Sequence, residues 1–469
     1  MIDLSPVTLP DFGIDDRLPN ISVAEYASRL DATVERMRAA DLDALVVYAD
    51  REHSANLAFL TGFDPRFEEA LLLMDAEGRR LLLVGNECMG YLPDIDLGLH
   101  VERFQPLSLM GQDRGASRPL RGIVSDFGIG HGARVGCAGW KYFDDHLVGD
   151  PQHAFEIPAY VIDLLRDMTG DTRRVRNVGA MFMNPTDGLR AVNSVDQIAR
   201  FEYAAIRTSE SVKALVFGLQ ENIPERDLES CYRPGGLPLS CHAMVSFGDK
   251  ARRGLSSPSS RRATLGEPFT AAFGIEGALT CRAGMVARDR DDVPDDRRAF
   301  FEAFAHHYVE IVATWYRHVR VGAIAGDVVA SVEARRDDRL MRFAVNPGHL
   351  IHVDEWMHSP FVPGGRSVLQ SGMALQMDII PVSRGPFVAM NAEDGVVLAD
   401  EALRGALAAA YPDAWARIEH RRAFMADVVG IELDPSVLPL SNIPAWIPPF
   451  GLDPGRALVA DRTPAPGGR

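Results

Sequence analysis

The chain has 469 residues, of which 46% are hydrophobic and 24% are charged, and its formal net charge is -16. Because single domains usually span roughly 50–250 residues, we expect two large domains. The composition is typical of a globular protein and argues against global disorder. An acidic surface repels phosphate backbones, so we expect no nucleic-acid partner.

Cysteine usage and the N-terminal sequence bear on the compartment. The five cysteines are scattered and include no CxxC pair, which favours reduced thiols in a cytosolic protein over a disulfide framework or a zinc site. The first 13 residues contain neither the basic nor the apolar segment of a signal peptide. No run of about 18 apolar residues predicts a transmembrane helix. We therefore expect a cytoplasmic protein with no membrane partner.

The first part of the chain predicts an α/β domain over residues 21–185, preceded by an irregular arm at residues 1–20 that is rich in Pro and Asp. A helix is expected after Ser22, because Ser22 can cap it and a Glu follows three residues later, as in a capping box. Residues 44–48 have the composition of a buried strand, and residues 71–84 that of a β-hairpin.

The second part predicts an α+β domain over residues 190–425. Its first helix is long and begins after Ser194, which can cap it. Strands dominate between residues 240 and 400, with helices near residues 297–318 and 326–340 among them, and a last helical stretch ends near residue 429.

A proline-rich extension follows at residues 426–469. Its segment from Leu438 to Phe450 holds too many prolines for a helix or a central strand, yet it is too apolar for a free tail. We expect this segment to cover a surface, either of its own domain or of a second subunit.

Three stretches of the second domain concentrate polar side chains. The stretch from Asn346 to Trp356 holds His349 and His352, and a strand then places Asp378 on the face opposite its apolar residues. A further strand near residues 390–398 carries Glu393.

In this order, these stretches resemble the creatinase, aminopeptidase P and prolidase family, which has the pita-bread fold. The family pattern matches Gly348-His349, Gly372-Met373, Asp378 with Pro381 nearby, and Glu393-Asp394. Similar segments extend the match over roughly residues 22–405, and these are Arg29-Leu30, Asp41–Val47, Leu60–Phe63, Asn193-Ser194 with Ile198, and Ser246–Gly248. The resemblance implies an α/β N-terminal domain plus an α+β pita-bread C-terminal domain.

The departures from the family pattern concern the metal site. Metal-dependent members carry two aspartates on the strand pair before the helix near residue 300. Here the first falls on Thr270 or Ala272 and the second on Cys281 or a neighbour, and neither is Asp. Such side chains cannot supply the carboxylates that two divalent cations need. We therefore predict that the usual dinuclear site is absent and expect no cofactor. Leu255 stands where the family tends to place a histidine.

The resemblance implies catalytic roles for His349, Asp378 and Glu393. His349 can exchange a proton near neutral pH. Two carboxyl groups in one site raise the pKa of one of them, so that one can act as an acid while the other stays ionised.

The remaining site candidates are substrate-binding residues. Arg282 is expected either to bind a substrate carboxylate or to form an internal ion pair. Cys281 is expected either to line the site or simply to fill space. His352 and Trp356 come from the same stretch as His349. Arg66 resembles the arginine that creatinase sends into the site of a partner subunit, which implies a homodimer.

The leading hypothesis is a creatinase-like hydrolase that cleaves a C–N bond of a small polar metabolite without a metal. One alternative is a peptidase-like hydrolase of the Xaa-Pro type, with a single divalent metal on His349, Asp378 and Glu393. Another is a lyase on the same fold. The last is a catalytically silent binding protein, since the family includes a histone chaperone subunit that lost its metals.

Overall fold

The computed structural model describes residues 2–460. The chain forms two compact units, one of Ile21–Ala191 and one that joins the residues from Val192 onward to the N-terminal residues up to Asn20. Among the described residues, no helix is both long and apolar enough to cross a membrane. All five cysteines are free thiols.

The Ile21–Ala191 unit is a mixed α/β domain built on a six-stranded sheet of order β5-β4-β3-β2-β6-β7. The strands are β2 (Ala44–Ala49), β3 (Ala70–Asp75), β4 (Arg80–Val84), β5 (His100–Arg103), β6 (Val135–Ala138) and β7 (Val175–Asn177). The helices are α1 (Val23–Ala39), α2 (Ala55–Thr61), α3 (Leu120–Asp126), α4 (Ala159–Thr169) and α5 (Ala180–Met183). The cap at Ser22, the strand β2 and the β3–β4 hairpin confirm the predicted elements.

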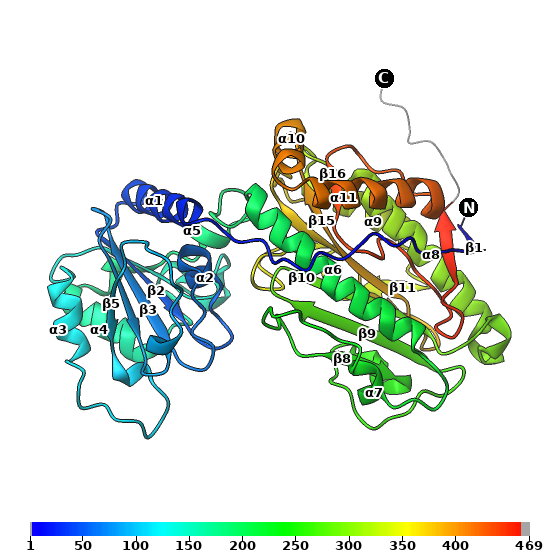
Figure 1. The fold of residues 1–469 in the computed structure, drawn as a ribbon, viewed down its shortest axis with the longest axis horizontal. Coiled ribbons are helices and arrows are strands. Elements are labelled where there is room, and N and C mark those ends of the chain that lie inside the picture. The colour runs from blue at the N-terminus through cyan, green and yellow to red at the C-terminus, as the bar shows by residue number, and fades with distance from the viewer. Residues whose placement is uncertain (1, 461–469) are drawn as a thin grey trace. The chain divides into compact units, whose positions relative to one another are not determined.

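The second unit contains a seven-stranded antiparallel sheet with the path β12-β13-β15-β10-β9-β8, in which β16 also pairs with β15. Its strands are β8 (Met244–Phe247), β9 (Pro268–Ile275), β10 (Ala278–Met285), β12 (His349–Leu350), β13 (Ala374–Asp378), β15 (Asn391–Leu398) and β16 (Val437–Pro439). The helices are α6 (Val195–Phe217), α7 (Glu225–Glu229), α8 (Asp295–His318), α9 (Ala325–Arg335), α10 (Glu401–Ala410) and α11 (Pro412–Phe424). The long helix α6 lies along β9 and β10 (Figure 1).

Two short ribbons complete this unit. One pairs β11 (Met341–Phe343) with β14 (Pro381–Ser383), and the other pairs β1 (Ile2–Pro6) with β17 (Arg456–Ala460). The prediction of an irregular arm was therefore wrong for residues 2–6. These residues form a strand because a partner strand near the other end of the chain satisfies their backbone groups.

Helix α9 ends at Arg335, earlier than the predicted residue 340. The backbone N–H of Asp337 donates to Nε2 of His307 on α8 instead of continuing the helical ladder. This contact ends the helix and brings the chain back to β11.

The proline-rich segment lies on its own unit. Every residue from Val437 to Phe450 is buried, β16 extends the edge of β15, and Phe450 bridges to Met285 at the end of β10. Of the two surfaces expected for this segment, the structure therefore shows the one within its own domain.

Candidate active site

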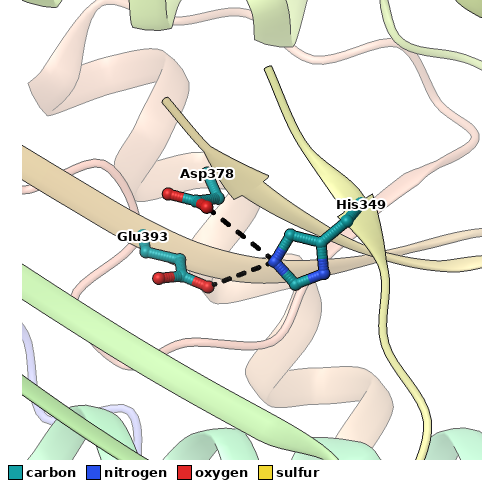
Figure 2. A group of neighbouring side chains, drawn as sticks. All are labelled: His349, Asp378 and Glu393. Carbon is teal, nitrogen blue, oxygen red and sulfur yellow. Dashed lines mark ion pairs between the residues drawn. The ribbon is translucent and has the colours of Figure 1, made fainter. Parts of the chain in front are cut away.

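Three strands place His349, Asp378 and Glu393 on one face of the sheet. Asp378 on β13 stands directly opposite Glu393 on β15, and His349 on β12 stands opposite Gln376 on β13. Directly paired residues of an antiparallel ladder point to the same side, and residues two apart on a strand do so too. Figure 2 shows the three side chains converging, with the imidazole facing both carboxyl groups. The structure thus brings together the three predicted catalytic residues.

The cluster is compact and almost free of solvent. Nε2 of His349 lies 3.6 Å from Oε1 of Glu393 and 3.9 Å from Oδ2 of Asp378, and one ligand atom of each residue falls within 4.8 Å of the others. The side chains of His349, Asp378 and Glu393 are 0%, 5% and 7% exposed. Such a buried group of ionisable side chains is typical of a functional site.

A bend after β12 adds two neighbours to the same imidazole. Oε1 of Glu355 lies 3.2 Å from Nε2 of His349, and the indole of Trp356 stacks on the imidazole at a centroid distance of 4.1 Å. Glu355 was not predicted as a site residue. Its place in the same polar stretch as His349 could have indicated it. The direction of its side chain could not be predicted, because an irregular bend has no periodicity.

Burial and mutual contact shift the pKa values of the cluster. Burial raises the pKa of Asp378 to about 7, although the charge of His349 opposes the rise. Burial and the charge of Asp378 raise the pKa of Glu393 well above its ordinary value. Burial alone would lower the pKa of His349, but its contacts with Glu355 and Glu393 outweigh this and raise the pKa to about 10. Near neutral pH, the cluster therefore holds a protonated imidazole and at least one protonated carboxyl group.

Two buried acceptors in the cluster have no donor. Among the described residues, Oδ1 of Asp378 and Oε1 of Gln376 make no hydrogen bond. The amide Nε2 of Gln376 donates to the backbone oxygen of Leu279 at 2.7 Å and to Oε1 of Glu393 at 3.2 Å, which fixes the amide. Because unsatisfied buried acceptors are costly, these two oxygens favour a bound group that carries N–H or O–H donors.

β10 and β9, which lie on the other side of β15 from β13, supply no carboxylate to this face. Cys281 on β10 pairs with Glu393 on one side and with Ala272 on β9 on the other, and Thr270 lies two residues further along the same face. Cys281 packs with Met244, Ala272 and Leu279 in a small apolar cluster. Burial, together with the charges of Glu393 and Asp378, raises the pKa of the Cys281 thiol, so the thiol stays neutral and fills space beside the acids.

Arg282 points to the opposite face, because neighbouring residues of a strand alternate. Its Nη2 donates to both carboxylate oxygens of Asp394, at 2.8 and 3.0 Å. Its Nε donates to the backbone oxygen of Trp446 at 2.7 Å, and its Nη1 to that of Cys281 at 2.6 Å. The prediction that Arg282 grips a substrate carboxylate does not fit this geometry. The internal ion pair, the other reading of Arg282, is present with Asp394 as its partner.

Two other predicted substrate contacts have different surroundings. The buried ring of His352 packs edge-on against Phe201 of α6, with centroids 5.4 Å apart. Arg66, in the Ile21–Ala191 unit, is 48% exposed and pairs with Asp64 at 3.4 Å. The roles of both residues in substrate binding stay predictions, as does the homodimer that Arg66 would require.

The sequence matches no protein-family model, and no curated protein is significantly similar to it in sequence. Solved structures, by contrast, share its fold. The prolidase from Thermococcus sibiricus superposes with a TM-score of 0.62 at 15% identity, over 81% of this chain and 96% of that one. The chain has the pita-bread fold.

Other structures with this fold are similar to a comparable degree. Dipeptidase PepE from Mycobacterium ulcerans has a TM-score of 0.59 at 18% identity, over 81% of this chain and 95% of that one. The X-Pro aminopeptidase from Thermotoga maritima MSB8 has a TM-score of 0.57 at 14% identity, over 79% and 95%. These likenesses confirm the fold that the motifs predicted, and an identity this low shows the fold alone.

Proposed function

We propose that the protein is a metal-independent hydrolase that cleaves a C–N bond in a small metabolite carrying a protonated nitrogen. The observation that carries this proposal is the buried cluster of His349, Asp378 and Glu393, whose ionisable atoms converge within 4.8 Å. Two carboxyl groups in one buried site can divide the roles of general acid and general base between them.

The raised pKa values suggest a role for each residue. Asp378, whose pKa of about 7 allows it to accept a proton near neutral pH, is the base that takes a proton from the attacking water. Glu393, whose pKa is raised well above its ordinary value by burial and by the charge of Asp378, is the acid that gives a proton to the leaving nitrogen. In the overall reaction, the hydroxyl of water goes to carbon and its proton to nitrogen. The protonated imidazole of His349 stabilises negative charge on the reacting carbon's substituents.

The nature of the charges around the cluster suggests the substrate class. Three acidic side chains, Asp378, Glu393 and Glu355, surround one imidazole, and the guanidinium of Arg282 is held on the opposite face. A protonated nitrogen with several N–H donors would satisfy Oδ1 of Asp378 and Oε1 of Gln376. The exposed part of Trp356 offers an aromatic face to the same cation.

The test is a substrate panel in the presence of a chelator. Guanidino, amidino and amino metabolites are incubated with the protein, each beside its neutral amide isostere, and release of amine or ammonia is followed. Hydrolysis of a cationic member in chelator is expected. Elimination without uptake of water would identify a lyase, and no turnover of any member would favour the silent binding protein. Either result would overturn the proposal.

A second candidate is a hydrolase with one divalent metal on the same three residues. It is favoured by the spacing of the three ligand atoms and by the buried Nε2 of His349, which makes ion pairs but no well-aligned hydrogen bond. The residues present do not fit a dinuclear centre, because β9 and β10 contain no Asp or Glu. A single ion would act as a Lewis acid and lower the pKa of a bound water. Activity lost in chelator and restored by a metal would establish this candidate.

A further inference from the structure

A cavity outside the candidate active site is lined by residues of the β1–β17 ribbon, the N-terminal half of α8 and the proline-rich segment. In Figure 1 the β1–β17 ribbon lies beside α8. The volume of the cavity is about 270 Å³, and none of the three catalytic candidates lines it. This volume is close to the lower end of the roughly 300–1,000 Å³ that is usual for small-molecule sites. The cavity is therefore large enough for a small organic ligand.

The floor and walls of the cavity are apolar. Leu4 and Leu458 are direct partners in the β1–β17 ladder, so both point to the same side of the ribbon. Phe301 of α8 and Phe450 of the proline-rich segment form an aromatic pair with centroids 5.8 Å apart. Ala305 lies one helical turn after Phe301, and its small side chain leaves the space open. An apolar lining of this kind favours a hydrocarbon body.

The rim of the cavity carries two acids, Asp289 and Glu302, and two arginines, Arg290 and Arg456. The carboxylate of Glu302 pairs with Arg290 at 3.2 Å, and that of Asp289 accepts a hydrogen bond from the backbone N–H of Asp291 at 2.8 Å. The side chains of Arg456 and His306, in contrast, have no hydrogen bond or ion pair among residues 2–460. Arg456 lies two residues from Leu458 on the same face of β17, at the edge of the apolar surface. Arg456 is thus a cationic side chain at the rim that no carboxylate among the described residues pairs with.

We propose that this cavity binds a small amphipathic anion, namely a carboxylate with a short hydrocarbon body. The carboxylate pairs with Arg456, and the hydrocarbon lies between the two leucines and the two phenylalanines. Arginine suits this role because its planar guanidinium can donate two parallel hydrogen bonds to one carboxylate. The inference rests on this cavity alone and is independent of the proposed hydrolase.

The test compares hexanoate with hexanol and hexylammonium by titration calorimetry on the full-length protein. Hexanoate is expected to bind, and hexanol of the same length to bind roughly tenfold more weakly, because it lacks the charge-assisted pair. Arg456→Gln should weaken hexanoate by roughly tenfold and leave hexanol unchanged. Arg335→Gln, at an exposed arginine of α9, is the matched control and should bind like the wild type.

A cavity-filling variant tests the location separately. Ala305→Leu should abolish binding of both hexanoate and hexanol, provided that its circular dichroism matches the wild type. The proposal is overturned if the wild type does not bind hexanoate, if hexanol binds equally well, or if Arg456→Gln has no effect. It is also overturned if a folded Ala305→Leu protein still binds hexanoate.

Discussion

The two faces of the seven-stranded sheet differ in whether their buried carboxyl groups have hydrogen-bond partners. Glu393 and Asp394 are neighbours on β15 and point to opposite sides. Asp394 is fully paired, with two hydrogen bonds from Arg282 and one from the backbone N–H of Ala445 at 3.0 Å. Glu393 shares its side with Asp378, whose Oδ1 has no donor among the described residues. A buried carboxylate whose oxygens all have hydrogen-bond donors stabilises the fold. A buried carboxyl group that lacks a donor can accept one from a ligand.

The largest effect is expected on the paired face. Arg282→Met should lower the free energy of unfolding by about 3–5 kcal/mol, because it leaves the buried carboxylate of Asp394 uncompensated. Guanidinium denaturation followed by fluorescence measures this change. Removing both charges in Arg282→Met with Asp394→Asn should restore part of the loss. A loss below about 1 kcal/mol in the single variant would show that the ion pair of Arg282 with Asp394 does not stabilise the fold.

On the other face, Glu393→Gln should abolish function rather than folding. The turnover number should fall by roughly 10²–10⁴-fold, because the acid that protonates the leaving nitrogen is gone. The free energy of unfolding should stay the same or rise, since burial disfavours the charged form of this side chain. Glu401→Gln, at an exposed position in the first turn of α10, is the control for both measurements. Unchanged turnover in Glu393→Gln would contradict its role.

The stability of Asp378→Asn relative to the wild type should depend on pH. The pKa of Asp378 is about 7 in the folded chain and 3.8 ordinarily, so the folded chain binds more protons between these values. The wild type therefore loses stability relative to the variant as the pH rises from about 4 to about 7, by roughly 1–4 kcal/mol. Denaturation curves at a series of pH values measure the difference. A constant difference, or one of the opposite sign, would mean that Asp378 is not desolvated.

The smallest effect is expected for Trp356. Trp356→Leu removes the ring stacked on His349, and aromatic stacking contributes about 0.5–1.5 kcal/mol beyond burial. The ratio kcat/KM for the cationic substrate should therefore fall by roughly two- to tenfold. Trp415→Leu, on α11, is the matched control. A loss of several hundredfold would instead place Trp356 among the reacting groups.

Local signals made much of the fold predictable. Ser22 and Ser194 cap the helices that were expected to follow them, and the spacing of the motifs around His349, Asp378 and Glu393 matched a family whose fold the structure shares. These features depend on residues near one another in sequence, or on a pattern already known.

Long-range pairing and side-chain direction were harder to predict. The β1–β17 ladder pairs residues 2–6 with residues 456–460, and nothing in the sequence of either segment indicates that the other is its partner. Arg282 points away from Glu393 because Cys281, the residue before it, is the one that pairs with Glu393. This pairing depends on the register of β10 against β15, which the sequence does not give. Glu355 reaches His349 from an irregular bend, where no periodicity applies.

The measurement that tests a metal-independent acid–base site most directly is the metal content of the purified protein, determined by elemental analysis beside that of Glu393→Gln. We predict that both proteins contain no stoichiometric metal and that turnover by the wild type persists in chelator. The contradicting result is a wild type with about one metal ion per chain that Glu393→Gln loses, because His349, Asp378 and Glu393 would then be its ligands.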